Sequence, residues 1–267
     1  MTQSHTLDEQ SIGHASGAPP TTTAVFVDLD GTLIPGSVNI PLAIGAFRAG
    51  LVPYRDLAVD LLRNASFILS GASDERAAQV RERILRAAAG FPAARLESIA
   101  DSFVGKLAQT IRPQMRAILD DHRARGHHLI LVSASPTEII ERFAKAAGMD
   151  LGVGTEGERD ENDCYTGRLA GPFCYREGKV EVLRYLSDQH GYDLSRSYAY
   201  TDSASDLPML EAVGNPVVVN PEPGLRNIAS TRSWGIVHFG RARRVELPGK
   251  PAAKLLATVR DLIVRKL

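Results

Sequence analysis

The chain has little cysteine, no excess charge of either sign and no long apolar run, and each shortage excludes a class of protein. Its 267 residues contain two cysteines, Cys164 and Cys174. Two are too few for a disulfide framework, and no neighbouring Cys or His pair completes a zinc site. Lysine plus arginine and aspartate plus glutamate both number 31. This balance gives no basic surface for nucleic acid, so we expect no nucleic-acid partner.

Membrane and export signals are absent as well. No apolar run approaches the roughly 20 residues that span a bilayer, and no charged segment followed by an apolar one opens the chain. We therefore predict a cytoplasmic protein without a membrane span, and free thiols at Cys164 and Cys174. The nine residues between the two cysteines, Tyr165–Phe173, predict a hairpin. The composition says nothing about the oligomeric state.

The most informative segment is Val25–Leu33, in which an apolar β-branched run ends in Asp28-Leu-Asp30-Gly31-Thr32. Such a run predicts a buried strand, and Gly31 predicts the turn that ends it. Asp28 and Asp30 then lie at the carboxyl end of the strand, where open α/β sheets bind ligands. Two carboxylates this close favour a hard cation or paired acid/base chemistry. The alternative is a solvated Asx turn that caps backbone amides.

A second strand, Tyr198–Thr201, also runs into carboxylates, Asp202 and Asp206. Ser203 or Ser205 is expected to cap the helix that follows. Taken alone, this pattern favours a helix N-terminus enriched in acidic residues.

A third strand, His128–Val132, ends at Ser133, and the helix after it begins near Ser135 and Glu138. A strand-to-helix turn offers backbone amides to an anion. Ser135 and Glu138 also have the spacing of an N-terminal capping box. Further on, Lys179 opens another predicted helix, and a single lysine is ordinarily a solvated surface charge.

Alternating strands and helices predict an α/β protein with a doubly wound, Rossmann-like parallel sheet and a helical cap inserted after the first strand. We assign residues 23–36 and 110–240 to the α/β core and 37–109 to the cap. Residues 1–22 are rich in small and polar residues and predict a disordered leader. Residues 241–267 predict a basic tail that ends in an amphipathic helix, which is expected to dock on its own domain. The alternative is that this helix lies on a membrane surface.

The order of these motifs resembles the haloacid dehalogenase superfamily, and most closely its phosphoserine-phosphatase-like branch. Asp-x-Asp-Gly-Thr comes first, followed by a strand ending in Ser133, then Lys179, then the Asp202-x-x-x-Asp206 pair. The segments Tyr165-Thr-Gly167 and Pro216–Pro221 are also similar to that branch. The resemblance extends over about residues 23–240.

The resemblance implies a covalent hydrolysis of phosphomonoesters. Asp28 would be the nucleophile that forms an aspartyl-phosphate, and Asp30 would be the general acid and then the base. Mg²⁺ would be held by the Asp28 carboxylate, the Asp30 main-chain carbonyl and Asp202, with Asp206 in a supporting position behind them.

The remaining phosphoryl oxygens would be bound by Thr32, Ser133 and Lys179. The partner would be a small phosphomonoester, possibilities being phosphoserine, histidinol phosphate, or the phosphate of a sugar or biosynthetic intermediate. Phosphoserine phosphatases carry a glutamate where this chain has Ser37, a departure that counts against phosphoserine itself. A phosphotransferase would use the same residues, and a non-catalytic binding protein is the third reading.

Overall fold

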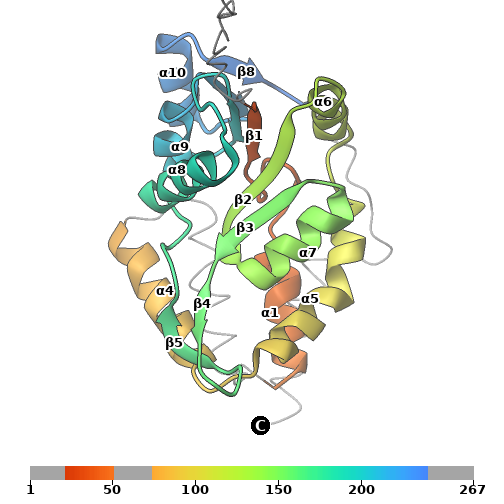
Figure 1. The fold of residues 1–267 in the computed structure, drawn as a ribbon, viewed down its shortest axis with the longest axis vertical. Coiled ribbons are helices and arrows are strands. Elements are labelled where there is room, and N and C mark those ends of the chain that lie inside the picture. Colours follow the sequence, from red (N-terminus) through yellow and green to blue (C-terminus); the bar gives the residue numbers. More distant parts are fainter. Residues whose placement is uncertain (1–21, 51–73, 240–267) are drawn as a thin grey trace, which may run out of the picture.

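The computed structural model describes residues 22–50 and 74–239 (Figure 1). The predicted tail and almost all of the predicted leader lie outside the described residues, as do residues 51–73 of the predicted cap.

The core is a six-stranded sheet in which every neighbouring pair of strands is parallel, in the order β3-β2-β1-β6-β7-β8. The strands are β1 (Ala24–Val27), β2 (His128–Pro136), β3 (Leu151–Thr155), β6 (Tyr198–Thr201), β7 (Asn215–Val219) and β8 (Gly235–Val237). The chain moves outward from β1 through β2 to β3 and then crosses to β6 on the other side of β1. The strand order therefore reverses between β1 and β6, the point at which such sheets bind ligands.

Helices cover both faces of this sheet, as Figure 1 shows, with α6 and α7 on one side and α8, α9 and α10 on the other. Their bounds are α6 (Pro113–Ala124), α7 (Thr137–Ala147), α8 (Glu177–His190), α9 (Leu207–Glu211) and α10 (Pro223–Thr231). All four residues of β1 are fully buried, with Val25 and Val27 in the core on the α6 and α7 side and Ala24 and Phe26 in the other. The predicted doubly wound parallel sheet is confirmed.

Three helices lie in the part of the predicted cap that is described: α1 (Asn39–Arg48), α4 (Asp74–Ala88) and α5 (Ala93–Ala108). Helix α5 packs against α1 and also against α7 of the core. Arg142 of α7 joins the two helices, since its guanidinium bonds Glu97 and Asp101 of α5 at 2.9 Å each. A cap that forms a separate domain stays a prediction.

The predicted hairpin lies earlier in the chain than expected. It pairs β4 (Gly157–Arg159) with β5 (Tyr165–Leu169), and it packs beside α4. Cys164 therefore comes just before β5 and Cys174 follows the loop after it, so the two thiols are not on facing strands. Both cysteines are free, as predicted. Among the described residues, no helix is long and apolar enough to cross a membrane.

Candidate active site

Asp28 stands at the carboxyl end of β1, in the middle of the sheet. Its backbone N–H extends the strand by donating to the Tyr200 carbonyl of β6 at 2.9 Å. Only 8% of the residue is exposed. Burial raises the pKa of Asp28 well above that of an ordinary carboxyl; Lys179 opposes this rise, and the neighbouring Asp206 and Asp202 add to it.

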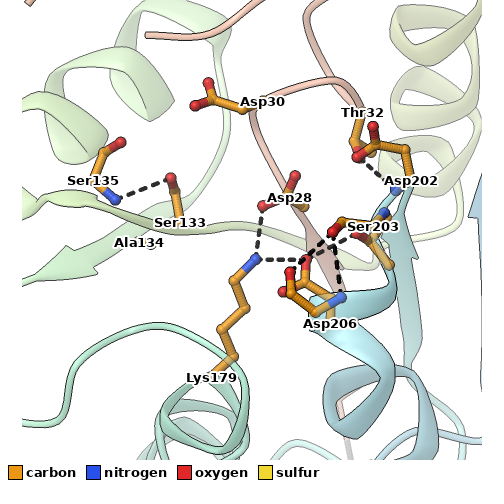
Figure 2. Close-up of polar contacts among 12 residues, drawn as sticks. Asp28, Asp30, Thr32, Ser133, Ala134, Ser135, Lys179, Asp202, Ser203 and Asp206 are labelled. Atoms are coloured by element: carbon orange, nitrogen blue, oxygen red, sulfur yellow. Dashed lines mark hydrogen bonds and ion pairs between the residues drawn. The ribbon is translucent and has the colours of Figure 1, made fainter. Parts of the chain in front are cut away.

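Lys179 joins two of the predicted carboxylates. It is the third residue of α8 and is almost fully buried, and its Nζ lies 2.7 Å from Asp28 Oδ1 and 2.7 Å from Asp206 Oδ2 (Figure 2). The Thr201 hydroxyl also donates to Asp206 Oδ2, at 2.8 Å. Burial opposes the charge of the ammonium, but the Asp206 and Asp28 carboxylates outweigh it and raise the pKa of Lys179. The lysine is thus a fixed cation against the nucleophile candidate.

Asp202 follows β6 and is held by Thr32. The Thr32 hydroxyl donates to Asp202 Oδ1 at 2.9 Å and accepts from the Asp202 backbone N–H at 2.9 Å. Thr32 is fully buried. The sequence predicts that Thr32 binds a phosphoryl oxygen. In the structure its hydroxyl is bonded to Asp202 instead, so Thr32 orients the Asp202 carboxylate. Burial raises the pKa of Asp202 to about 6, although the Thr32 bond opposes the rise.

Gly31 allows the turn after β1 to pass close to Asp202. Its φ is +81°, a left-handed conformation that favours glycine. A Cβ at this position would lie 2.8 Å from the Asp202 carboxylate carbon, and closer still to Oδ2. The turn is closed by the Gly31 N–H, which donates to the Gly36 carbonyl at 3.1 Å.

Asp30 stands apart from this cluster in Figure 2. Its carboxylate accepts from the Ser37 hydroxyl at 2.7 Å and from the Val38 backbone N–H at 2.8 Å, and these two residues come directly before α1. Burial raises the pKa of Asp30, and these two bonds oppose the rise. A raised pKa suits a carboxyl that has to carry a proton near neutral pH.

Ser133 lies in the second half of β2, three residues before the strand ends at Pro136, and is 4% exposed. Its Oγ accepts from the Ser135 backbone N–H at 3.3 Å. The capping box predicted for Ser135 and Glu138 is wrong. Strand β2 continues to Pro136, and the Glu138 carboxylate accepts from Arg159 of β4 at 2.8 Å, so Glu138 is not available to a backbone amide. At the other predicted cap, Ser203 does accept from the Ser205 backbone N–H.

The excess of negative charge in the site is suited to a bound cation. The site holds three carboxylates, those of Asp28, Asp202 and Asp206, and one ammonium, which bonds Asp28 and Asp206. Burial is the main cause of the raised pKa of Asp28 and of Asp202, and neighbouring carboxylates add to it. Carboxylate and carbonyl oxygens are the ligands that Mg²⁺ takes. In the part of the chain that is described, no three His, Cys, Asp or Glu side chains converge as a ready metal cage. Two carboxylates and a main-chain carbonyl, completed by water and substrate oxygens, are nevertheless a normal magnesium set.

Arg112, just before α6, is a neighbour of the site that the sequence analysis missed. Its guanidinium donates to the Gly31 carbonyl at 3.1 Å, and its backbone N–H donates to Leu33 at 3.0 Å. The residue thereby braces the turn that carries Asp28 and Asp30. An arginine before a helix-opening proline carries no sequence signal of this role, because its partner lies 81 residues earlier.

Comparisons with known proteins identify the family of the chain. The family model described as haloacid dehalogenase-like hydrolase matches residues 25–211. A probable phosphatase of Mycobacterium tuberculosis is 34% identical over 244 residues, which cover 90% of this chain and 84% of that protein. A phosphoserine phosphatase of the same organism is 32% identical over 237 residues, covering 88% of this chain and 77% of the relative.

Among solved structures, a protein of unknown function from Bordetella pertussis Tohama I superimposes with a TM-score of 0.68 at 30% identity. The match covers 81% of this chain and 98% of that one. The fold is therefore shared over nearly the whole of that neighbour.

Proposed function

Because the chain belongs to the haloacid dehalogenase-like hydrolase family, we propose that it is a Mg²⁺-dependent phosphomonoesterase that forms an aspartyl-phosphate on Asp28. The observation that carries the proposal is the buried Lys179 ammonium, 2.7 Å from both Asp28 and Asp206 at the point where the strand order reverses. A fixed cation beside a buried carboxylate is what an anionic phosphoryl group needs when a carboxylate attacks it.

Asp28 supplies the nucleophile. One of its carboxylate oxygens forms a bond to phosphorus while the bond from phosphorus to the ester oxygen breaks. Lys179 bonds Asp28 Oδ1, which holds the carboxylate in one orientation and balances part of the charge on the arriving phosphoryl group. Ser133, on the neighbouring strand β2, donates its hydroxyl to a phosphoryl oxygen.

Asp30 moves the protons. It gives its proton to the departing ester oxygen in the first step. In the second step a water attacks phosphorus, Asp30 takes the proton of that water, and the bond between phosphorus and Asp28 breaks to release inorganic phosphate. The raised pKa of Asp30 and its position two residues beyond the nucleophile support both roles.

A magnesium ion would be held by the Asp28 and Asp202 carboxylates and the Asp30 main-chain carbonyl. It would supply positive charge to the phosphoryl oxygens and allow substrate and carboxylates to share the site. Thr32 fixes Asp202 for that purpose through two bonds of 2.9 Å. Asp206 keeps Lys179 in place.

The test is phosphate release from a panel that contains phosphoserine, histidinol phosphate and several sugar phosphates, each with Mg²⁺ and with EDTA. Asp28→Asn should abolish release on every compound and leave folding intact. Asp188→Asn, an exposed aspartate on α8, is the matched control and should retain full activity. Appreciable turnover by Asp28→Asn would refute the nucleophile assignment. Transfer of phosphate to an added alcohol, with little free phosphate, would indicate a phosphotransferase instead.

A further inference from the structure

The two residues before α1 and the first residue of α1 bond the Asp30 carboxylate. Three donors from consecutive residues reach its carboxylate: the Ser37 hydroxyl to Oδ2 at 2.7 Å, the Val38 N–H to Oδ1 at 2.8 Å and the Asn39 amide to Oδ2 at 3.4 Å. The Ser37 bond is the shortest, and it is the only short bond from a side chain. Asn39 is exposed, and its 3.4 Å bond to Asp30 is the longest of the three.

We propose that Ser37 is a positioning residue for Asp30, which it holds in the orientation needed for proton transfer to the leaving group. The proposal rests on the proposed function, because it gives Ser37 a role only if Asp30 is the acid and base of the reaction. No bond joins Ser37 to Asp28, Lys179 or Asp202 among the described residues. Its effect should therefore be confined to the step in which Asp30 takes part.

The two short bonds hold both oxygens of the Asp30 carboxyl group. The Ser37 hydroxyl donates to Oδ2 at 2.7 Å and the Val38 N–H donates to Oδ1 at 2.8 Å. Ser37 serves as a donor, because a proton that Asp30 gave to Ser37 would not be directed at the ester oxygen. With both oxygens held, the carboxyl group is not free to rotate between the two steps, and Ser37→Ala removes one of the two bonds that hold it.

The same hydroxyl also accepts from the Asn39 backbone N–H at 3.2 Å. Ser37 is thus bonded both to Asp30 and to the first turn of α1. A purely structural role as a helix cap is the competing explanation, and it predicts a loss of stability that is indifferent to the leaving group. The two roles can be separated by varying the leaving group.

The experiment uses the full chain with Mg²⁺ and two substrates, phenyl phosphate and 4-nitrophenyl phosphate. Phenol has a pKa of about 10, like the tyrosine side chain, and leaves with the help of an acid. The much more acidic 4-nitrophenol needs little help. We expect Ser37→Ala to lower kcat/KM for phenyl phosphate by about 10- to 100-fold, and for 4-nitrophenyl phosphate by less than about 3-fold.

Two further variants remove the ambiguity. Ser37→Thr and Ser37→Val have nearly the same shape, and only threonine keeps the hydroxyl, so Thr should restore the phenyl phosphate rate while Val should not. Ser102→Ala, which removes a hydroxyl bonded within α5, is the matched control and should change neither substrate. Equal losses on both substrates, or equal rates for the Thr and Val variants, would overturn the role of Ser37. If Asp28→Asn still turned over either substrate, the proposed function itself would fail, which is a different result.

Discussion

Gly31→Ala is the substitution that tests the geometry of the site most directly. The change adds one methyl group to a turn that has no room for it. The new Cβ would lie 2.8 Å from the Asp202 carboxylate carbon, where ordinary contact begins at 3.4 Å, and closer still to Oδ2. The carboxylate consequently has to move by roughly 1 Å, since the backbone of the turn is held by its own bonds.

Two magnitudes follow from this geometry. A left-handed φ of +81° costs an alanine about 1 kcal/mol of folding stability relative to glycine. Moving Asp202 by roughly 1 Å displaces a predicted metal ligand, and a misplacement of that size lowers the rate by about 100-fold. We expect kcat/KM to fall by about that factor, and a higher Mg²⁺ concentration to recover part of the loss.

Substitutions at two other glycines separate the effect of backbone strain from the effect of the close contact with Asp202. Gly126 has a φ of +75° with nothing within 4 Å of an added Cβ, so Gly126→Ala imposes the backbone strain alone. Gly36 lies in the same turn as Gly31, also with nothing within 4 Å and without a left-handed φ, so Gly36→Ala imposes neither. Urea unfolding in EDTA reports stability without the metal, and phosphate release at increasing Mg²⁺ reports the site.

The expected pattern is a loss of stability in both Gly31→Ala and Gly126→Ala and a loss of activity in Gly31→Ala alone. If Gly31→Ala kept an activity within about 3-fold of Gly126→Ala, the close approach to Asp202 would have no part in catalysis.

Two further predictions concern pH and the metal. Burial, with the neighbouring His127 and Arg125, lowers the pKa of the buried His122 to about 4. The unfolded chain binds a proton there near pH 6.5 and the folded chain does not, so up to about 3 kcal/mol of stability is lost as the pH falls from 6.5 to 4. Urea unfolding of wild type and His122→Gln across that range should diverge by this amount, and parallel curves would contradict the assignment. For the metal, EDTA should lower phosphate release by more than about 100-fold, and Ca²⁺ should inhibit because it accepts a looser coordination shell; full activity with either would rule out the magnesium site.

The part of the site that strand order determines could be predicted from the sequence. Asp28, Ser133 and Asp202 each follow an apolar run that forms a parallel strand, and the carboxyl ends of parallel strands meet at one edge. The apolar runs that gave β1, β2 and β6 are short and β-branched or aromatic, with turn residues after them. Local sequence therefore predicts each strand, although β2 continues to Pro136, beyond its apolar run.

Side-chain direction could not be predicted in the same way, because it depends on partners far along the chain. Thr32 bonds a carboxylate 170 residues away, and Glu138 pairs with an arginine on the hairpin instead of capping its own helix. Asp30 is an intermediate case, since its partner Ser37 is only seven residues away. Pro35 and Gly36 predict a break in the chain at that point, but they do not predict that the next residue bonds Asp30.

Lys179 shows how tertiary packing can bury a lysine that the sequence alone suggests is on the surface. A lysine near a helix start is by default a surface charge, yet this one is 2% exposed. The preceding Gly178 lets the backbone of Phe173 approach the first turn of α8, because a Cβ there would lie 2.8 Å from the Phe173 carbonyl carbon. That approach brings the first turn of α8 against the loop before it and buries the ammonium between Asp28 and Asp206. The Lys179 ammonium is held there by bonds of 2.7 Å to each of the two carboxylates. The burial of Lys179 therefore depends on Gly178 and on the loop before α8 as well as on the lysine itself. The position of that loop could not be predicted from the sequence around Lys179.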